Sequence, residues 1–166
     1  MGERLTQGDI DKIKKEIEYR TLVVRKEAIE AVSEARAQGD LSENFEYYAA
    51  KKDKNKNESR IRYLEKMLKY AQIVSDESRE DEVGINNTVD VYFEDDDEVE
   101  TYRLVTSVRG NSLQGLISIE SPLGKALKGH KVGDRVFVKA GDSGYYVVIR
   151  KIENTTDDSH DTLRKY

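Results

Sequence analysis

The stretch from Gly39 to Lys51 reads Gly-Asp-Leu-Ser-Glu-Asn-Phe-Glu-Tyr-Tyr-Ala-Ala-Lys. It places two carboxylates, Asp40 and Glu43, at a turn between two long charged segments with helical spacing of their apolar residues. Gly39 suits the position after a helix C-terminus, where a left-handed backbone costs glycine nothing. Acids at the far end of a helical hairpin cannot be buried in the chain's own core. We therefore expect them to meet a partner or ligand from outside.

Two stripes of residues, one on each side of this turn, predict an antiparallel helical hairpin. The first helix is expected to end near Gln38, and its stripe consists of Ile10, Ile13, Ile17, Thr21, Val24, Ala28, Ala31 and Ala35. The second stripe alternates steps of three and four residues, as in coiled coils, through Tyr47, Ala50, Lys54, Asn57, Ile61, Leu64, Leu68 and Ala71. Pairing about the turn sets Ile17 opposite Leu64 and Val24 opposite Asn57. The seam should be apolar at its base and small or polar toward its tip.

Length and composition limit what surrounds this hairpin. The chain has 166 residues, 37% of them charged and 37% hydrophobic, with a mean hydropathy of -0.77. This favours a coiled coil plus a modest domain over a thick globular core. The absence of cysteine excludes disulfides, thiolate metal sites and cysteine nucleophiles. No apolar signal core or membrane-spanning stretch is apparent, so we expect a cytoplasmic protein with no membrane partner.

After Ser75 the pattern changes to period two with β-branched residues, which predicts a small antiparallel sheet. The expected strands are Val89 to Phe93, Thr101 to Val108, Leu116 to Ile119, Arg135 to Lys139 and Tyr145 to Ile152. Residues 121–129 predict one short helix, with a serine N-cap, a proline in the first turn and a glycine stop. The fold class is therefore α+β. We divide the chain into a hairpin (1–75), a linker (76–82), a sheet domain (83–153) and a polar tail (154–166) that we expect to be frayed.

Charge is distributed unevenly along the chain. Residues 1–75 carry sixteen Lys and Arg against fourteen Asp and Glu, whereas the remainder is strongly acidic within a total net charge of -5. The segment from Lys51 to Lys69 holds eight basic and three acidic residues. It could face a nucleic-acid backbone or be an ordinary solvated helix face, and charge alone does not separate these two interpretations.

The two tip acids also have an ordinary structural interpretation. The spacing Asp-x-x-Glu before an amphipathic helix resembles a capping box, with Asp40 as the N-cap and Glu43 at the third helical position. Spacing alone favours this interpretation. Ser42 could instead be the N-cap, which would leave both acids free to point outward.

Other polar and aromatic features receive plain interpretations. The acidic run 94–98 lacks the spaced ligands of a calcium loop and is predicted to be a solvated hairpin turn. His130 and His160 are too far apart to suggest a zinc site. For Phe45, Tyr47 and Tyr48 near the tip, packing is favoured over contact with RNA or with a surrounding partner.

Two groups of residues resemble a known family. Residues 39–44, followed by Glu46, Tyr47 and 49–51, resemble the tip signature of the bacterial Gre transcript cleavage factors, closest to the GreA branch. Residues 121–127, with Gly129 and 132–134, are similar to that family's C-terminal FKBP-like domain. The order and spacing of these motifs hold over residues 5–152.

This resemblance implies a monomeric factor that binds RNA polymerase and inserts its coiled coil into the secondary channel. It implies that the polymerase, rather than the factor, then hydrolyses the 3′ end of backtracked RNA. Asp40 and Glu43 would help hold a second Mg²⁺, which the polymerase mainly binds and which the factor alone would not bind stably. By the same resemblance, Ser42 and Asn44 would support the two acids. Lys51 and Lys52 would bind RNA. The residues implied for docking on the polymerase are Ser121, Pro122, Leu123 and Gly124.

The chain departs from the family pattern at several positions. Phe45 stands where a small residue is usual, Lys26 and Lys54 are unusual, and the tail beyond Glu153 is longer. One alternative is therefore a paralogue that occupies the channel and inhibits transcription without promoting cleavage. A weaker alternative, from fold analogy alone, is a peptidyl-prolyl isomerase, although the second half has few aromatic residues to line a proline pocket.

Overall fold

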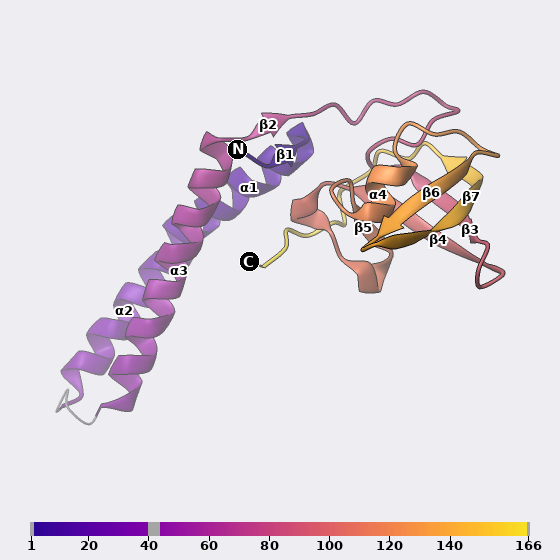
Figure 1. Ribbon diagram of the computed structural model, residues 1–166. Coiled ribbons are helices and arrows are strands. Elements are labelled where there is room, and N and C mark those ends of the chain that lie inside the picture. Colours follow the sequence, from indigo (N-terminus) through magenta and orange to yellow (C-terminus); the bar gives the residue numbers. More distant parts are fainter. Residues whose placement is uncertain (1, 40–43, 166) are drawn as a thin grey trace. The chain divides into compact units, whose positions relative to one another are not determined.

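The computed structural model describes residues 2–39 and 44–165 and confirms an α+β fold (Figure 1). Contacts within the chain divide it into two units. The first comprises residues 1–3 and 10–71, and the second comprises residues 4–9 and 72–166. Residues 40–43, which include Asp40, Ser42 and Glu43, lie outside the described residues.

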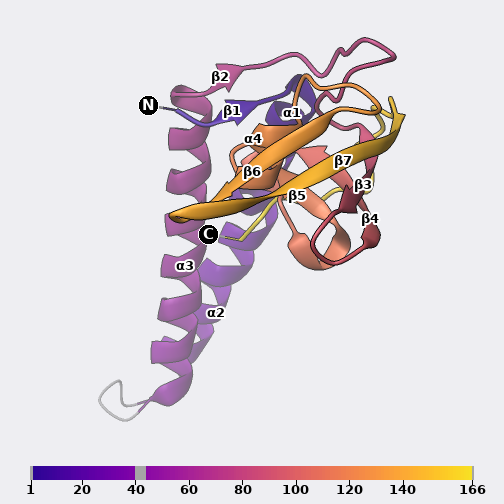
Figure 2. The ribbon, with the colours of Figure 1, turned by 45° about the vertical axis from the view of Figure 1, so that its right-hand side comes forward.

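The first unit is the predicted helical hairpin. One side consists of α1 (Gln7–Tyr19), a π-helical turn η1 (Arg20–Val24) and α2 (Arg25–Ala37), and the other side is α3 (Phe45–Lys69). Both ribbon views show α3 running alongside the first side (Figures 1 and 2). The 25 residues of α3 give an arm of roughly 37 Å at 1.5 Å per residue.

The seam of the hairpin largely follows the two predicted stripes. All members of the second stripe are buried or half-buried. Buried apolar residues toward the base are Ile10, Ile13, Ile61, Leu64 and Met67, and Ala35 near the tip is buried as well. In the first stripe Ala31 is exposed and Val32 is half-buried instead, so that one assignment was wrong. Ala28 and Ala35 on either side keep their places in the seam, so this segment steps by four and then three residues instead of three and then four.

A buried asparagine accompanies this π-helical turn. The Arg20 carbonyl accepts the i+5 hydrogen bond from the Arg25 N–H and a second one from Asn57 Nδ2 at 3.1 Å. Asn57 Oδ1 in turn accepts from Arg20 Nη1 at 3.1 Å. Asn57 was expected opposite Val24, and its side chain instead bonds one turn nearer the base. A polar residue in such a seam favours one register of the two helices.

The second unit contains a five-stranded sheet in the order β5-β4-β3-β7-β6. Its strands are β3 (Thr88–Phe93), β4 (Glu98–Val105), β5 (Leu116–Ser118), β6 (Arg135–Ala140) and β7 (Ser143–Glu153). The sheet is antiparallel except for the β4–β5 pair, which is parallel, so it is mixed rather than purely antiparallel. A separate parallel pair, β1 (Arg4–Leu5) with β2 (Gln72–Ile73), was not foreseen.

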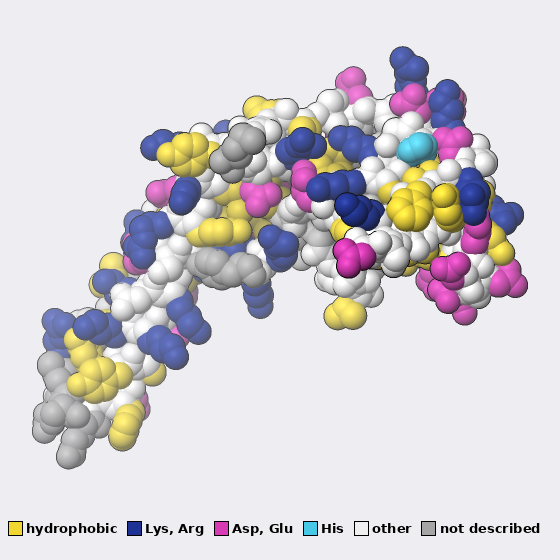
Figure 3. All heavy atoms as spheres, in the orientation of Figure 1, with side chains coloured by type: hydrophobic (Ala, Val, Ile, Leu, Met, Phe, Trp, Pro, Cys, Tyr) yellow, Lys and Arg dark blue, Asp and Glu magenta, His cyan; other side chains and the backbone are white. Residues whose placement is uncertain are grey.

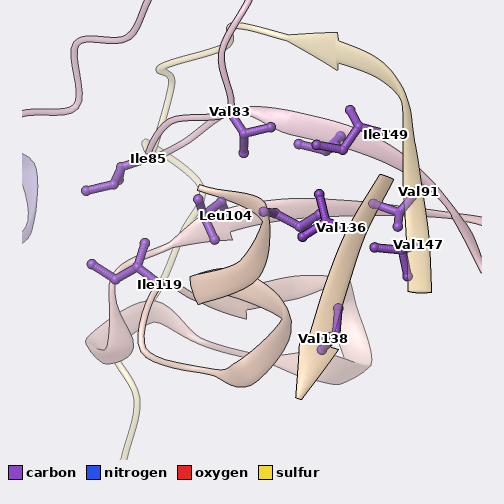
Figure 4. Packing of buried hydrophobic residues seen from close by; sticks show 11 residues of the cluster. Val83, Ile85, Val91, Leu104, Ile119, Val136, Val138, Val147 and Ile149 are labelled. Carbon is purple, nitrogen blue, oxygen red and sulfur yellow. The ribbon is translucent and has the colours of Figure 1, made fainter. Parts of the chain in front are cut away.

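The core of the second unit is formed by alternating residues on one face of the sheet. Figure 4 shows valines of β6 and β7 lying with Val91 and Leu104 of the central strands. Leu127 of α4 (Pro122–Leu127) is 1% exposed and belongs to the same cluster. Period-two alternation therefore identified the buried face of this sheet correctly.

Both ends of the strand predicted at residues 101–108 need correction, whereas the hairpin turn predicted before it is confirmed. The strand predicted to end at Val108 ends at Val105, because Ser107–Arg109 form a 3-10 turn (η2). It also begins three residues early, at Glu98. The preceding acidic residues 94–97 form the predicted turn between β3 and β4, where Asp97 has a φ of 50°.

The C-terminal tail is held against the second unit rather than frayed. Asn154 Nδ2 donates to the Glu82 carbonyl at 3.2 Å and to Asn87 Oδ1 at 3.0 Å. Further along, the Arg164 N–H donates to the Val108 carbonyl at 2.6 Å. Polar composition alone suggested a loose tail, but the hydrogen-bond acceptors that hold it lie far away in the sequence.

Candidate functional site at the distal end of the hairpin

Two residues close the helices on either side of the turn. Helix α2 ends at Ala37 with Gln38 as its C-cap, and Gly39 follows with a φ of 144°. This positive φ favours glycine, and open space surrounds the residue, so conformation rather than crowding requires it. Asn44 is the N-cap of α3. The predicted acids thus occupy a connection bounded by Gly39 and Asn44.

Asn44 uses its whole side-chain amide within the hairpin. Its Oδ1 accepts from the Tyr47 N–H at 3.0 Å, and its Nδ2 donates to the Ala35 carbonyl at 2.6 Å. One bond caps α3 and the other joins the ends of the two helices. Because Asn44 is the cap of α3, the alternatives that placed Asp40 or Ser42 there were wrong. Asp40 therefore does not serve as the cap of this helix.

We expect loss of this double contact to fray the end of α3. In an Asn44→Ala variant, the amides of Tyr47 and Tyr48 should exchange with solvent about fivefold faster or more, since an N-cap contributes about 1 kcal/mol. Asn44→Asp keeps the capping acceptor and adds a charge favoured at a helix N-terminus, so it should retain most of the protection. Hydrogen exchange of the full chain measures both, with the exposed Asn55→Ala as control. Equal exchange in wild type and Asn44→Ala would contradict this role.

Aromatic side chains occupy the first turn of α3, and a basic side chain of α2 contacts one of them. The Arg36 guanidinium lies 5.6 Å from the Tyr47 ring centroid and donates to its hydroxyl at 3.4 Å, which lowers the Tyr47 pKa. Tyr47 is half-buried, as predicted. Phe45 and Tyr48 are 86% and 53% exposed, so packing was the wrong interpretation for these two. The spacing of Phe45 and Tyr48 by three residues places them close together on one helix, but it could not show that both side chains are exposed.

Basic side chains continue along the helix beyond this aromatic group. Lys51 and Lys52 are exposed, and neither forms an ion pair with any residue that the structure describes. Figure 3 shows Lys and Arg side chains gathered along the visible face of the hairpin. Lys54, in contrast, is half-buried in the seam. The exposed pair is therefore free to attract an external anion, as a phosphate-facing role requires.

Ion pairs brace the middle of the arm and connect the two helical sides. Glu16 accepts from Arg60 Nε and Arg20 Nε, both at 2.8 Å. Arg25 forms a two-bond fork with Glu58, with both distances 2.9 Å. Burial raises the pKa of Glu16, but the hydrogen bonds from Arg60 and Arg20 outweigh this and hold the pKa below its ordinary value.

The lowered pKa of Glu16 predicts acid sensitivity of the hairpin. A carboxyl with a folded pKa below its unfolded value of about 4.3 stabilises the fold fully above that value. This stability is lost as the pH falls through the folded pKa. As the pH is lowered below about 5, we expect the Tm of the wild type, measured by circular dichroism, to decrease. The Tm of Glu16→Gln should decrease less steeply over the same pH range. The exposed Glu30→Gln serves as control, and identical slopes in wild type and Glu16→Gln would contradict the assignment.

The predicted docking residues of the second unit have mainly structural contacts. Ser121 Oγ caps α4 by accepting from the Gly124 N–H at 3.1 Å and donates to the Ser118 carbonyl at 2.6 Å. A Cβ on Gly124 would lie 1.9 Å from that same carbonyl oxygen, so only glycine fits there. Leu123 is half-buried against the core. Of the four predicted residues, only Pro122 is exposed.

An open depression adjoins Pro122. It has a volume of about 450 Å³ and is lined by Glu120, Pro122, Lys125, Ala126, Phe137, Lys139 and Gly141. Phe137 is 48% exposed and packs edge-on against Tyr146. The depression thus combines an apolar floor with two lysines at its edge. The alternation of buried residues in β6 would have placed Phe137 on the outer face of the sheet. That residues of α4 line the same depression could not be inferred from sequence spacing.

Two absences concern only the part of the chain that the structure describes. Among residues 2–39 and 44–165, no three His, Asp or Glu side chains are arranged to hold a metal ion. Within the same ranges, none of the helices is long and apolar enough to cross a membrane.

Comparisons with known proteins cover nearly the whole chain. Residues 3–73 match the family described as transcription elongation factor, N-terminal, and residues 78–154 match transcription elongation factor, GreA/GreB, C-terminal. The transcription elongation factor GreA of Streptococcus pneumoniae serotype 19F is 41% identical over 152 residues, which are 91% of this chain and 95% of that protein. GreA of Streptococcus gordonii is 42% identical with the same coverage. Among solved structures, GreA factor homolog 1 (Gfh1) of Thermus thermophilus shows 26% identity and a TM-score of 0.43, covering 92% of this chain and 99% of that one.

Proposed function

Because the chain belongs to the Gre family of transcription elongation factors, we propose that it inserts its hairpin into the secondary channel of RNA polymerase. There it stimulates Mg²⁺-dependent cleavage of the 3′ end of backtracked RNA. The polymerase carries out the chemistry, and this protein is an accessory factor that acts as a monomer.

The distal end of the hairpin is the observation that carries this proposal. Gly39 and Asn44 close the two helices, so the segment containing Asp40 and Glu43 lies at the far end of a slender arm. Capping of α3 by Asn44 relieves Asp40 of that role. A two-helix arm is narrow enough to enter a channel, and only its end would then reach an active site.

The proposed chemistry requires only two carboxylates from the factor. Two metal ions stabilise the attacking and leaving oxygens of an in-line phosphodiester displacement. Mg²⁺ keeps several waters and needs only one or two carboxylates beside phosphate oxygens. Asp40 and Glu43 would complete the weaker of two metal sites and orient the attacking water. Alone, the factor should bind Mg²⁺ only weakly.

Other parts of the hairpin and the second unit support the complex. The exposed Lys51 and Lys52 would face the transcript. The second unit would dock on the outside of the channel, with Pro122 and the adjoining depression offering the exposed surface. Ser121, Leu123 and Gly124 would contribute to docking by shaping α4, because their own contacts are internal.

A transcript cleavage assay tests the function. Purified protein added to stalled, backtracked elongation complexes should shorten the RNA and release short 3′ fragments, and both effects should require Mg²⁺. Slower elongation without released fragments would instead identify an inhibitory paralogue. In a prolyl-peptide assay we expect no isomerase turnover.

A further inference from the structure

A buried cluster of four charges lies within the second unit. Arg109 and Asp9 have fully buried side chains, and those of Asp161 and Arg103 are 7% and 16% exposed. The four groups comprise two cations and two anions, so the cluster is balanced. An unpaired buried charge is costly, and each member therefore depends on the others.

Asp161 links this cluster to the C-terminal tail. Arg103 Nη1 lies 2.7 Å from both Asp161 carboxylate oxygens, and Arg109 Nη1 lies 2.7 Å from Oδ2. Arg103 Nη2 also donates to the Asp157 carbonyl at 2.7 Å. Charge-assisted bonds of this length are the strong class of protein hydrogen bonds. The tail thus supplies the second anion that the two arginines require.

Asp9 links the same cluster to the N-terminal segment 4–9. Its carboxylate pairs with Arg109 Nε and accepts from the Thr6 N–H at 2.9 Å and from Thr106 Oγ1 at 2.6 Å. Thr6 Oγ1 accepts in return from the Asp9 N–H at 3.2 Å, which forms a capping box at the start of α1. The chain passes to the first unit directly after Asp9.

The tail also lies directly against segment 4–9. A Cβ added to Gly8 would stand 2.1 Å from Asp158 Oδ2, so the Asp158 side chain of the tail lies directly against this residue. Among the described residues beyond Ile152, none belongs to the hydrophobic cluster of the sheet, and Leu163 is the one apolar side chain, half-buried. The tail is therefore held mainly by polar contacts, and such a segment can open locally without unfolding the sheet.

We propose that residues 154–165 form a detachable strap that holds segment 4–9 on the second unit, with Asp161 as its main anchor. Opening of the strap leaves Arg103 and Arg109 with one anion between them and uncovers Gly8. Segment 4–9 is then held less tightly. This proposal does not depend on the function proposed above.

Amide hydrogen exchange of the full chain, resolved by peptide, tests the strap. Asp161→Asn should accelerate exchange at least about tenfold both in the tail and in segment 4–9, because the charge-assisted hydrogen bonds that it removes are the strong class in proteins. Exchange in the central strand β3 should not change. Asp157→Asn is the matched control, because it removes an exposed tail carboxylate and leaves the Arg103 contact with the Asp157 carbonyl in place.

The outcomes separate the proposal from simpler explanations. Acceleration confined to the tail, no acceleration, or an equal effect of Asp157→Asn would each overturn it. If Asp161→Asn unfolds the whole unit, a double variant with Arg103→Gln decides, because it restores charge balance around Arg109 and Asp9. We expect that variant to fold and to exchange faster in both the tail and segment 4–9. A loose tail beside a protected segment 4–9, or failure to fold, would refute the strap.

Discussion

Replacing Asp40 by Asn or Glu43 by Gln is expected to abolish stimulated RNA cleavage while leaving polymerase binding within about twofold of wild type. Each change keeps the size of the side chain and removes the negative charge that would hold the second Mg²⁺. A loss of at least about 100-fold in the cleavage rate corresponds to about 2.7 kcal/mol of transition-state stabilisation, which is modest for a metal ligand. The cleavage rate at saturating factor measures this loss.

The matched control for the tip acids is Asp53→Asn. Asp53 is an exposed acid on helix α3, ten residues beyond Glu43 in the sequence, and its loss should leave the cleavage rate unchanged. Raising the Mg²⁺ concentration should partly restore cleavage in the tip variants, because a weaker site fills at higher metal. If the tip variants lost binding in parallel with cleavage, the acids would be docking residues and the proposed metal role would be wrong.

Replacing Arg109 by Met is expected to destabilise the second unit by about 3–5 kcal/mol, the usual cost of breaking a buried ion pair on one side. The side chain is fully buried and joins Asp9 to Asp161. Methionine fills similar space but leaves Asp9 in the interior without its cation. Urea unfolding of the full chain, followed by the tyrosine signal of the sheet, measures the loss.

An exposed arginine of the same unit provides the comparison. Arg135 pairs with Glu94 at 2.7 Å and its guanidinium lies 3.6 Å from the Tyr146 ring centroid, but solvent reaches it freely. Surface pairs contribute little, so Arg135→Met should cost far less stability than Arg109→Met. Equal losses in the two variants would show that burial of the Arg109 cluster has no special importance.

Local sequence patterns determined most of the architecture. The helical stripes identified the hairpin and its weak distal seam, and Ser121, Pro122 and Gly129 marked the short helix α4 correctly. These features could be predicted because helix periodicity, capping and glycine turns depend on residues within a few positions of one another. The same is true of the turn itself, where Gly39 ends α2 as expected.

Only the tertiary structure decided which polar residues are structural. Asn44, rather than Asp40, caps α3, because its amide also reaches Ala35 on the other helix. Val32 rather than Ala31 lies in the seam, and the polar tail proved to be anchored through Asp161. The contacts of Asn44 and Asp161 join residues between nine and 58 positions apart, and one-dimensional spacing carries no information about such pairs. The sequence thus determined the hairpin and the sheet, because periodicity and turn residues are local, while the distant polar contacts that hold its caps and tail were decided by three-dimensional packing.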